Sequence, residues 1–337
     1  MAKFSIFLPV YNGGEYLKDC IRSILSQSLT DYELIVLNNF SNDGTTEWLG
    51  TLKDPKLKIY QSDRLLSMEE NWDRILAIPK CEFMTIIGHD DLLDENYLAT
   101  MNELIVQNPE PGLFQCHFRI INAQGEVMRN CKPMKKDISD NEFLEGILTD
   151  SIDTMGTGYM MRSADFESAG GIHGYPNLLF ADHALWLKLV KGRKLAVAAK
   201  HAFSFRVHQS ISRLTEVPRY IKAFYLFMDF LSEYRKTETA IESVIKKYIN
   251  NYILFHCQSF SHRLLKTPVK YRDGLSVKGV MLKCKEYASL LNPGSLFQPE
   301  KRFSMQLSCF IDGNKFLRDI YLLFRSIYKM PIYSRIN

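Results

Sequence analysis

The amino-acid sequence predicts an α/β fold built around a mostly parallel sheet. Short apolar segments recur through residues 1–90, and segments whose apolar residues have helical spacing separate them. Glycine, asparagine and aspartate follow several of the apolar segments, as expected where a strand ends in a loop. Such an alternation of strands and helices is typical of a parallel sheet with helices on its faces.

The elements of this alternation can be placed in order along the chain. The apolar segments that predict strands run over 4–8, 32–37, 57–60 and 83–87. After the first strand, one face of a helix is marked by Leu17, Cys20, Ile21, Ile24 and Leu25. A short helix is expected over 46–49. Ser67, followed three residues later by Glu70, predicts a capping box at the start of a third helix.

Two adjacent carboxylates, Asp90 and Asp91, follow the fourth predicted strand. Gly88 ends that strand, since a residue without Cβ adopts backbone angles that other residues resist. In open α/β sheets, ligands bind at the edge formed by the carboxyl ends of the strands. Adjacent carboxylates repel each other at neutral pH, and a divalent cation such as Mg²⁺ or Mn²⁺ relieves that repulsion. The alternative is a turn in which Asp94 caps the next helix.

Further strands and helices are expected beyond the carboxylates. The segment 113–121 predicts a strand, and the turn at 122–125 predicts that it forms a hairpin with 126–128. A helix is expected over 140–148. The glycine-rich segment 156–162 then leads into another step from strand to helix.

The composition is that of a globular protein, with 46% hydrophobic and 24% charged residues among 337. The seven cysteines are scattered without a CxxC pair, which argues against a disulfide framework or a zinc site and favours a reducing compartment. The apolar N-terminus is interrupted at Pro9, too early for a signal peptide. No apolar run reaches the length of about 18 residues that a membrane-spanning helix needs. We therefore expect a cytoplasmic protein.

Charge is distributed unevenly between residues 1–214 and residues 215–337. The first region carries a net charge of −6 and the second a net charge of +10. The second region is also aromatic, and helical spacing predicts helices over 220–234, 241–265, 281–291 and 316–328. Two alternatives stay open for these helices. They pack on the rest of the chain or on a partner, or they bind anionic lipid or a lipid diphosphate at the inner face of the cytoplasmic membrane. The sequence contains no nucleic-acid-binding motif.

Three motifs, taken in order, resemble glycosyltransferase family 2. They are Pro9-Val10-Tyr11-Asn12, the segment 34–45, and Gly88-His89-Asp90-Asp91. Each motif alone is weak, and the order and spacing carry the resemblance. The family consists of inverting enzymes of GT-A fold. The resemblance therefore implies a nucleotide-binding α/β domain with a smaller mixed sheet for the acceptor over 1–214, followed by a C-terminal helical extension over 215–337.

The resemblance also implies a set of site residues. Asp182 would be the catalytic base, or else only the N-cap of a helix. Asp90 would hold a divalent cation, Mn²⁺ or Mg²⁺, with His208 as a further ligand and Asp91 as a second ligand or a hydrogen-bonding neighbour. The nucleotide would lie against Pro9, Tyr11, Asn12, Asn38, Asn71, His89, Asp90 and Arg206. The sugar and the acceptor would lie against Gly156, Thr157, Gly158, His183 and Trp186.

The sequence departs from the family pattern in three places. Asn38 and Asn39 replace two acids, and Asn38 still offers an amide oxygen to a base. Gly88 replaces the first acid of the metal motif. Ala181 and Ala184 replace the acids that flank Asp182.

We therefore expect a metal-dependent, inverting transfer of a sugar from a nucleotide donor, for which UDP is favoured, to a hydroxyl of a glycan. The glycan is free or lipid-linked, as in the synthesis of bacterial capsule or O-antigen. One alternative is a catalytically weak relative that binds a nucleotide sugar. Another is a sugar-nucleotidyltransferase, which would need a basic phosphate-binding loop that the segment 9–14 lacks.

Overall fold

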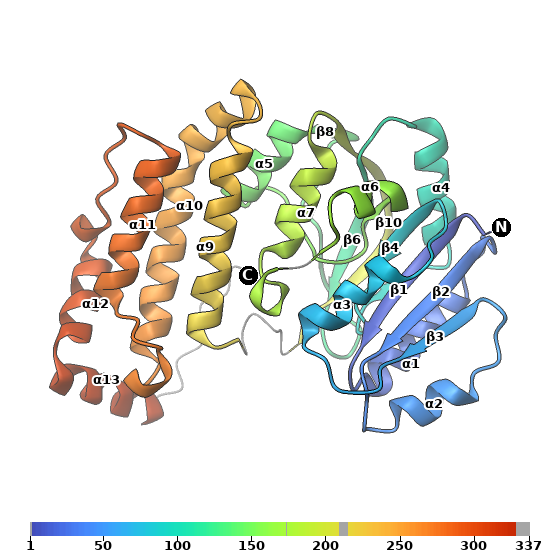
Figure 1. The fold of residues 1–337 in the computed structure, drawn as a ribbon, viewed down its shortest axis with the longest axis horizontal. Helices are drawn as coiled ribbons and strands as arrows, with labels where there is room; N and C mark the ends of the chain where they lie inside the picture. Colours follow the sequence, from blue (N-terminus) through green and yellow to red (C-terminus); the bar gives the residue numbers. More distant parts are fainter. Residues whose placement is uncertain (1, 173, 209–214, 328–337) are drawn as a thin grey trace. The chain divides into compact units, whose positions relative to one another are not determined.

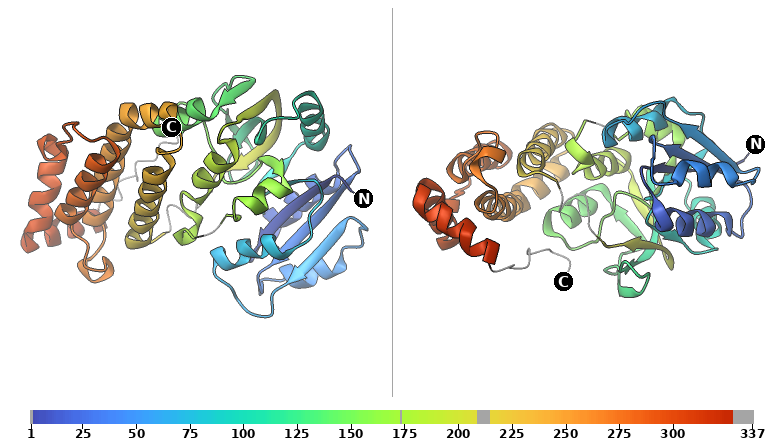
Figure 2. Two further views of the ribbon diagram at one scale, coloured as in Figure 1. Left: turned by 45° about the horizontal axis from the view of Figure 1, so that its top comes forward. Right: turned by 90° about the horizontal axis from the view of Figure 1, so that it is seen from below.

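The computed structural model describes residues 2–172, 174–208 and 215–327. The chain divides into two compact units, Met1–Leu214 and Thr215–Asn337, and each is considered by itself. Figure 1 and Figure 2 show a sheet with helices in the first unit, whereas the described part of the second unit consists of helices and loops.

One mixed sheet forms the framework of the N-terminal unit. Its strands are β1 (Phe4–Val10), β2 (Tyr32–Asn38), β3 (Leu57–Gln61), β4 (Phe83–Ile86), β5 (Leu92–Leu93), β6 (Leu113–Ile121), β7 (Val127–Asn130), β8 (Asp137–Ser139), β9 (Met160–Arg162) and β10 (Lys194–Arg206). Their order is β3-β2-β1-β4-β9-β6-β10-β5, with β7 on β6 and β8 on β10. The adjacent strands β3, β2, β1 and β4 are parallel to one another, and β6 is parallel to β10. β9 lies between these two groups and runs antiparallel to β4 and to β6. The carboxyl ends of β1, β4, β6 and β10 therefore share one edge.

Helices cover both faces of this sheet. They are α1 (Gly14–Leu25), α2 (Thr45–Thr51), α3 (Met68–Ala77), α4 (Tyr97–Gln107), α5 (Asp140–Thr149), α6 (Ser163–Ser168), the 3₁₀ turn η1 (Pro176–Leu178) and α7 (Ala181–Val190). The connection β1-α1-β2 moves across the sheet toward the β3 edge, and the connection β3-α3-β4 moves across it in the opposite direction. Because such crossovers are right-handed, α1 and α3 lie on opposite faces, and α3 is on the near face in Figure 1. Every residue of β1 is buried between them.

Most elements expected from the sequence are present, including the strand 113–121 and its hairpin. The predicted capping box is confirmed, since the Glu70 amide donates to Ser67 Oγ and the Ser67 amide donates to Glu70 Oε2. The Asp94 cap is wrong: Asn96 holds the N-cap position of α4. The Asp94 carboxylate instead pairs with Arg119 at 2.9 Å.

The C-terminal unit is a set of helices around an aromatic core. They are α9 (Val217–Tyr234), α10 (Thr239–Leu265), η2 (Val269–Tyr271), α11 (Val277–Leu291), η3 (Pro299–Lys301), α12 (Phe303–Gly313) and α13 (Lys315–Ile327). Phe224 packs against His256 and Phe260, with ring centroids 4.7 and 5.2 Å away. A buried ion pair joins Arg272 to Asp312. Among the described residues, no helix is both long enough and apolar enough to cross a bilayer.

Candidate active site

A carboxylate and an imidazole meet at the edge of the sheet. Asp90 lies in the loop after β4, and His208 lies two residues beyond the end of β10. Asp90 Oδ2 and His208 Nε2 are 2.5 Å apart. The two side chains are 25% and 29% exposed, so a solute can reach them. The structure thus brings together two of the residues for which we predict metal ligation.

Asp91 is buried beneath this pair, with only 1% of its surface exposed. Its Oδ1 accepts the backbone N–H of Arg206 at 3.0 Å, and its Oδ2 accepts the hydroxyl of Thr157 at 2.7 Å. Burial and, after it, the negative charge of Asp90 raise the pKa of Asp91. Because both oxygens are engaged by protein donors, the geometry favours Asp91 as a hydrogen-bonding neighbour over Asp91 as a direct metal ligand.

Arg206, at the end of β10, connects the loop after β4 to the turn between β6 and β7. Its Nε donates to the carbonyl of Asp90 at 2.7 Å, and its Nη1 donates to the carbonyls of Asn122 and Ala123 at 3.2 and 3.1 Å. The residue is only 5% exposed. The geometry therefore favours a positioning role for Arg206, and contact with a diphosphate stays a prediction.

Tyr16 was not among the residues expected at the site. Its ring lies 4.8 Å from the guanidinium of Arg206 and 5.3 Å from the ring of His208. The aromatic face supports both groups, and its quadrupole favours the cation of Arg206. No motif signalled this role, because Tyr16 lies on α1, far in sequence from Arg206 and His208, which it contacts.

Gly88 gives the carboxylates the space that they occupy. A Cβ at this position would lie 2.7 Å from Asp90 Oδ1 and 2.9 Å from Asp91 Oδ2. Both distances are too short for ordinary contact, so the observed arrangement requires glycine here. A larger residue at position 88 would require these two carboxylates to move.

The loop before β9 lies against the end of β4. The Gly158 amide donates to the carbonyl of Ile86 at 2.9 Å. Gly158 has φ +76°, and a Cβ there would lie 2.7 Å from the ring of Phe203. Trp186 is fully buried, and its indole N–H donates to the carbonyl of Met155 at 2.9 Å. We therefore revise the expectation for Trp186: it positions this loop and has no surface to offer an acceptor.

Asp182 faces the same loop from the first turn of α7. Phe180 occupies the N-cap position with φ 65°, so the N-cap alternative for Asp182 is wrong. Asp182 Oδ1 accepts the backbone N–H of His183 at 2.8 Å. Its Oδ2 would lie 3.7 Å from a Cβ at Gly156, so the carboxylate and the glycine are neighbours. The structure thus places Asp182 beside the segment that also anchors Asp91.

His183 points to a different partner from Asp182. Its Nε2 lies 2.9 Å from the hydroxyl of Thr154, and its side chain is partly buried. This contact ties the start of α7 to the loop 154–158. Contacts of Gly156, Thr157 and His183 with a sugar or an acceptor stay predictions.

Asn38 and its surroundings form a closed polar network. The Asn38 amide donates to Thr46 Oγ1 at 2.9 Å and to Gln61 Oε1 at 2.7 Å, and its oxygen accepts the Ser41 hydroxyl at 2.7 Å. The residue is completely buried. Asn38 therefore fixes the loop 38–45, and its contact with a base stays a prediction.

The neighbouring amides also serve the loops. Asn39 donates to the carbonyl of Leu66 and accepts its N–H, both at 2.9 Å. A carboxylate could not donate to that carbonyl, which gives a physical reason for asparagine in place of the family's acid. Asn71 donates to the carbonyl of Leu37 at 3.3 Å and accepts from Arg74 at 2.9 Å. Because Asn71 is only 4% exposed, this geometry favours support of the β2 end over contact with a nucleotide.

The other residues expected at the nucleotide lie at the end of β1 or next to Asp90. Pro9 is buried within β1, whereas Tyr11 is 43% exposed. Asn12 has φ 50°, and its side-chain oxygen accepts a hydrogen bond from the backbone N–H of Asn42 at 3.0 Å. Burial is the main cause that lowers the pKa of His89. Tyr11 and Asn12 are thus the exposed members of this set.

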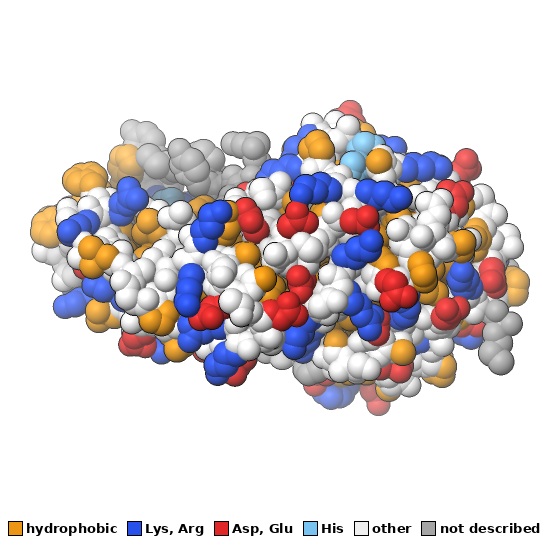
Figure 3. All heavy atoms as spheres, turned by 90° about the horizontal axis from the view of Figure 1, so that it is seen from above, with side chains coloured by type: hydrophobic (Ala, Val, Ile, Leu, Met, Phe, Trp, Pro, Cys, Tyr) orange, Lys and Arg blue, Asp and Glu red, His pale blue; other side chains and the backbone are white. Residues whose placement is uncertain are grey.

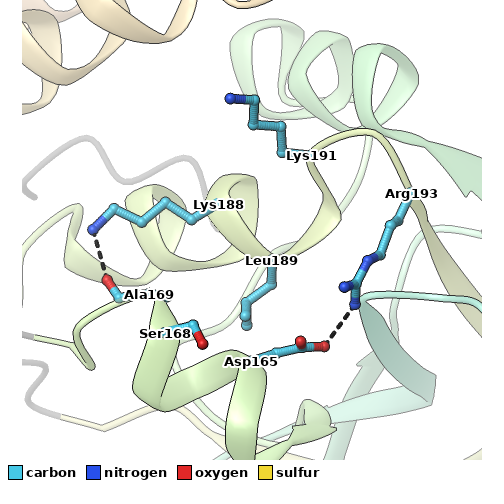
Figure 4. A pocket seen from close by; sticks show the side chains of 7 residues that line it. All are labelled: Asp165, Ser168, Ala169, Lys188, Leu189, Lys191 and Arg193. Carbon is cyan, nitrogen blue, oxygen red and sulfur yellow. Dashed lines mark hydrogen bonds and ion pairs between the residues drawn. The ribbon is translucent and has the colours of Figure 1, made fainter.

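A cavity of about 420 Å³ lies beside α6 and the last turn of α7 (Figure 4). Lys188 donates to the carbonyl of Ala169 at 3.0 Å, and Arg193 pairs with Asp165 at 2.6 Å. The cavity is at the opposite end of α7 from Asp182. We therefore give it no part in the chemistry of the carboxylates.

A divalent cation fits the donors offered by Asp90 and His208. Carboxylate oxygen suits Mn²⁺ and Mg²⁺, which keep other positions for phosphate oxygens and water. Metal–ligand distances near 2.1 Å would separate the two donor atoms by roughly 3 Å. The observed 2.5 Å therefore needs only a small opening of the pair.

Known proteins resemble this chain in sequence and in fold. The model of the family described as glycosyl transferase family 2 matches residues 5–166. Glycosyltransferase GlyG of Streptococcus pneumoniae serotype 4 is 25% identical over 103 residues, which are 30% of this chain. The match spans about a third of the length of GlyG, at 34%.

Two solved structures share the fold. The crystal structure of Staphylococcus aureus TarS in complex with UDP-GlcNAc has a TM-score of 0.68 at 14% identity and covers 98% of this chain and 95% of that one. The mannosyltransferase PcManGT of Pyrobaculum calidifontis, in complex with GDP-Man and Mn²⁺, has a TM-score of 0.52 at 13% identity and covers 98% and 88%. Residues 5–166 thus belong to glycosyl transferase family 2, and the two solved structures show that the chain shares their fold.

Proposed function

We propose that the protein transfers a sugar from a nucleotide-sugar donor to a hydroxyl group of a glycan, with inversion at the anomeric carbon. The observation that carries the proposal is the pairing of Asp90 with His208 at the strand edge. Asp182, beside Gly156, supplies a carboxylate that is separate from that pair. A metal-binding pair and a separate base are the two functions that such a transfer needs.

Each residue has a distinct role in this proposal. Asp90 and His208 hold a divalent cation, which when bound stabilises the negative charge on the departing diphosphate. Asp182 takes the proton of the attacking hydroxyl as the new bond forms. Ala181 and Ala184 leave no acids next to Asp182 in sequence, so fewer like charges act on its carboxylate.

We further propose UDP as the nucleotide of the donor and Mn²⁺ or Mg²⁺ as the cation. The related fold of TarS holds UDP-GlcNAc, and that of PcManGT holds GDP-Man and Mn²⁺, so both nucleotides belong in the test. Nucleotide release from UDP-GlcNAc and from GDP-Man should be measured with Mn²⁺ and with excess chelator. Mn²⁺-dependent release from the UDP-sugar supports the proposal. Release only from GDP-Man contradicts the UDP assignment, and tight donor binding without release under any condition favours a binding-only relative.

The acceptor that we propose is a lipid-linked glycan at the inner face of the cytoplasmic membrane. The C-terminal unit supports this proposal with its +10 charge and with exposed aromatic side chains on α12 and α13. Phe303, Phe310 and Phe316 are 76%, 66% and 70% exposed. Figure 3 shows hydrophobic side chains on the surface beside Lys and Arg. Aromatic side chains and nearby cations suit an anionic lipid surface.

Vesicle co-sedimentation of the full chain tests the membrane proposal. Replacing Phe303, Phe310 and Phe316 together by Ser should abolish binding to anionic vesicles, and salt should weaken binding of the natural chain. Val106→Ser is the matched control, since Val106 is 68% exposed in the N-terminal unit. Equal sedimentation of the triple variant and the control would refute the assigned lipid surface.

A further inference from the structure

Two histidines and a cysteine from three segments of the N-terminal unit come together away from Asp90. His117 on β6 pairs with His201 on β10 in the sheet register, and their rings are 5.5 Å apart. Cys131 follows β7 and lies beside both rings. One ligand atom from each residue, a ring nitrogen or Sγ, lies within 4.8 Å of the other two.

We propose that His117, Cys131 and His201 bind a transition-metal ion of the zinc type, with one thiolate and two imidazoles as ligands. Zinc prefers this mixture of sulfur and nitrogen, whereas Mn²⁺ and Mg²⁺ prefer oxygen. The site is therefore chemically distinct from the pair Asp90 and His208. The scattered cysteines argued against a zinc site at the level of sequence spacing. The fold supplies the convergence that spacing could not show.

Cys131 is buried, and its sulfur accepts a backbone hydrogen bond. The side chain is buried, at 7% exposed. The backbone N–H of Phe118 donates to its Sγ at 3.4 Å, and the Cys131 N–H donates to the carbonyl of Phe118 at 2.8 Å. Burial raises the pKa of the free thiol. Metal binding therefore exchanges the S–H bond for an S–metal bond and releases one proton to solvent.

The ring of His201 can provide a lone pair to a metal ion. Burial, then His117 and Arg119, lowers the pKa of His201, so its imidazole is neutral. Two cations lie near the site, and each has an acidic partner. Arg119, near His201, pairs with Asp94 at 2.9 Å, and Arg129, near Cys131, pairs with Asp153 at 2.7 Å. A neutral imidazole is the form that ligates metal.

Closing the site needs modest rearrangement. Four-coordinate zinc, with bonds of about 2.0–2.3 Å, places its ligand atoms roughly 3.5 Å apart. The three atoms must therefore approach one another by about 1 Å. The Met134 N–H donates to His117 Nε2 at 3.2 Å, and ligation replaces this single hydrogen bond because a neutral ring has one lone pair. The segment that adjusts is the connection 131–136 between β7 and β8.

The bound ion would act on β10. The register of β10 against β6 shifts on both sides of His201, which marks an irregular point in the strand. Arg206 lies five residues further along the same strand and contacts Asp90 and Asp91. An ion joining β6, β10 and the segment after β7 would hold this irregular strand in register. Its role is thus structural, with a fourth position left for water or an outside ligand.

Cobalt titration of the full chain, freed of metal by a chelator and desalted, tests the site. Co²⁺ should produce a sulfur-to-cobalt charge-transfer band that saturates at one equivalent and disappears on addition of Zn²⁺. Asp90 and His208 contain no sulfur and cannot produce this band. Cys131→Ser should abolish the band, whereas Cys81→Ser, which alters a partly buried cysteine outside the cluster, should keep it.

Two further measurements keep the test decisive. His201→Gln should weaken Co²⁺ binding by more than the roughly 10–100-fold that loss of an outer-shell partner costs. Zn²⁺ should raise the thermal midpoint of the natural chain. Absence of the band in the natural chain, or an undiminished band in Cys131→Ser, would overturn the proposal. Should Cys131→Ser fail to fold, the natural chain and His201→Gln decide.

Discussion

The hydroxyl of Thr157 donates to Oδ2 of the buried Asp91 at 2.7 Å. This contact joins the loop before β9 to the loop after β4. The other oxygen of Asp91 accepts the Arg206 amide at the end of β10, so one carboxylate connects three segments. Its neighbour Asp90 is left to face His208 and solvent. Asp91 thus supports the edge of the sheet, whereas the partly exposed carboxylate of Asp90 is the one that we propose as a metal ligand.

Thr157→Val tests the supporting contact. Valine keeps the shape of threonine but leaves Oδ2 of a buried carboxylate without its donor, so the free energy of unfolding should fall by about 1–3 kcal/mol. Thr157→Ser, which keeps the hydroxyl, should lose much less. Denaturant unfolding of the two variants measures the difference. Equal stability of the valine and serine variants would show that the contact contributes nothing.

Gly88→Ala tests the space occupied by the carboxylates. The new Cβ would meet Asp90 Oδ1 and Asp91 Oδ2, both on short side chains that cannot easily withdraw. We expect Mn²⁺-dependent donor binding to weaken by on the order of 10–100-fold, the usual effect of disturbing the groups around a metal ligand. Gly50→Ala is the control, because nothing lies within 4 Å of its added Cβ. Calorimetric titration checks the prediction, and unchanged donor affinity in Gly88→Ala would contradict it.

The lowered pKa of His262, on α10, should make the stability of the C-terminal unit depend on pH. Its pKa is lowered to about 4, chiefly by burial and then by Lys266, Arg325 and Arg263. Between that value and the unfolded pKa of about 6.5, the unfolded chain binds a proton that the folded chain does not bind. His262 therefore does not lower the free energy of unfolding above about pH 6.5, whereas it lowers that free energy increasingly as the pH falls from about 6.5 toward 4. Because the side chain is only partly buried, the slope should stay below the limit of about 1.4 kcal/mol per pH unit.

His262→Gln removes the titrating group while it keeps a polar side chain. Denaturant unfolding at neutral pH and at about pH 5 should show a smaller loss of stability in this variant than in the natural chain. Identical losses in the two proteins would assign the acid sensitivity to other groups.

Local signals in the sequence predicted the strands, the Ser67 cap and the aspartates at the end of β4, because periodicity, capping and strand ends are short-range properties. Long-range contacts decided the rest. Local sequence favoured Asp94 as a helix cap, but its carboxylate forms an ion pair with Arg119, which lies on β6. The family resemblance implied that Trp186 contacts the sugar or the acceptor, but the side chain is fully buried and donates to the carbonyl of Met155. Motif matching assigns a position, whereas burial decides whether a side chain can meet a ligand.

β10 and Tyr16 show a second limit of sequence reasoning. The strand 194–206 has an irregular register around His201, so strict alternation of polar and apolar residues is absent and no strand was predicted. Tyr16 contributes to the site through contacts with Arg206 and His208, which come from the far end of the N-terminal unit's sequence. Neither feature can be read from a window of neighbouring residues.

The nucleotide-release rate of Asp182→Asn, at saturating UDP-sugar and Mn²⁺, is the measurement that decides whether Asp182 is the catalytic base. Asparagine keeps the size of the side chain and an oxygen for the His183 amide, but it cannot take a proton. We expect normal folding, unchanged donor affinity and release slower by roughly 10²–10⁴-fold, the usual effect of losing a general base. Near-natural release by this variant, with donor binding intact, would contradict the role of Asp182 as the base.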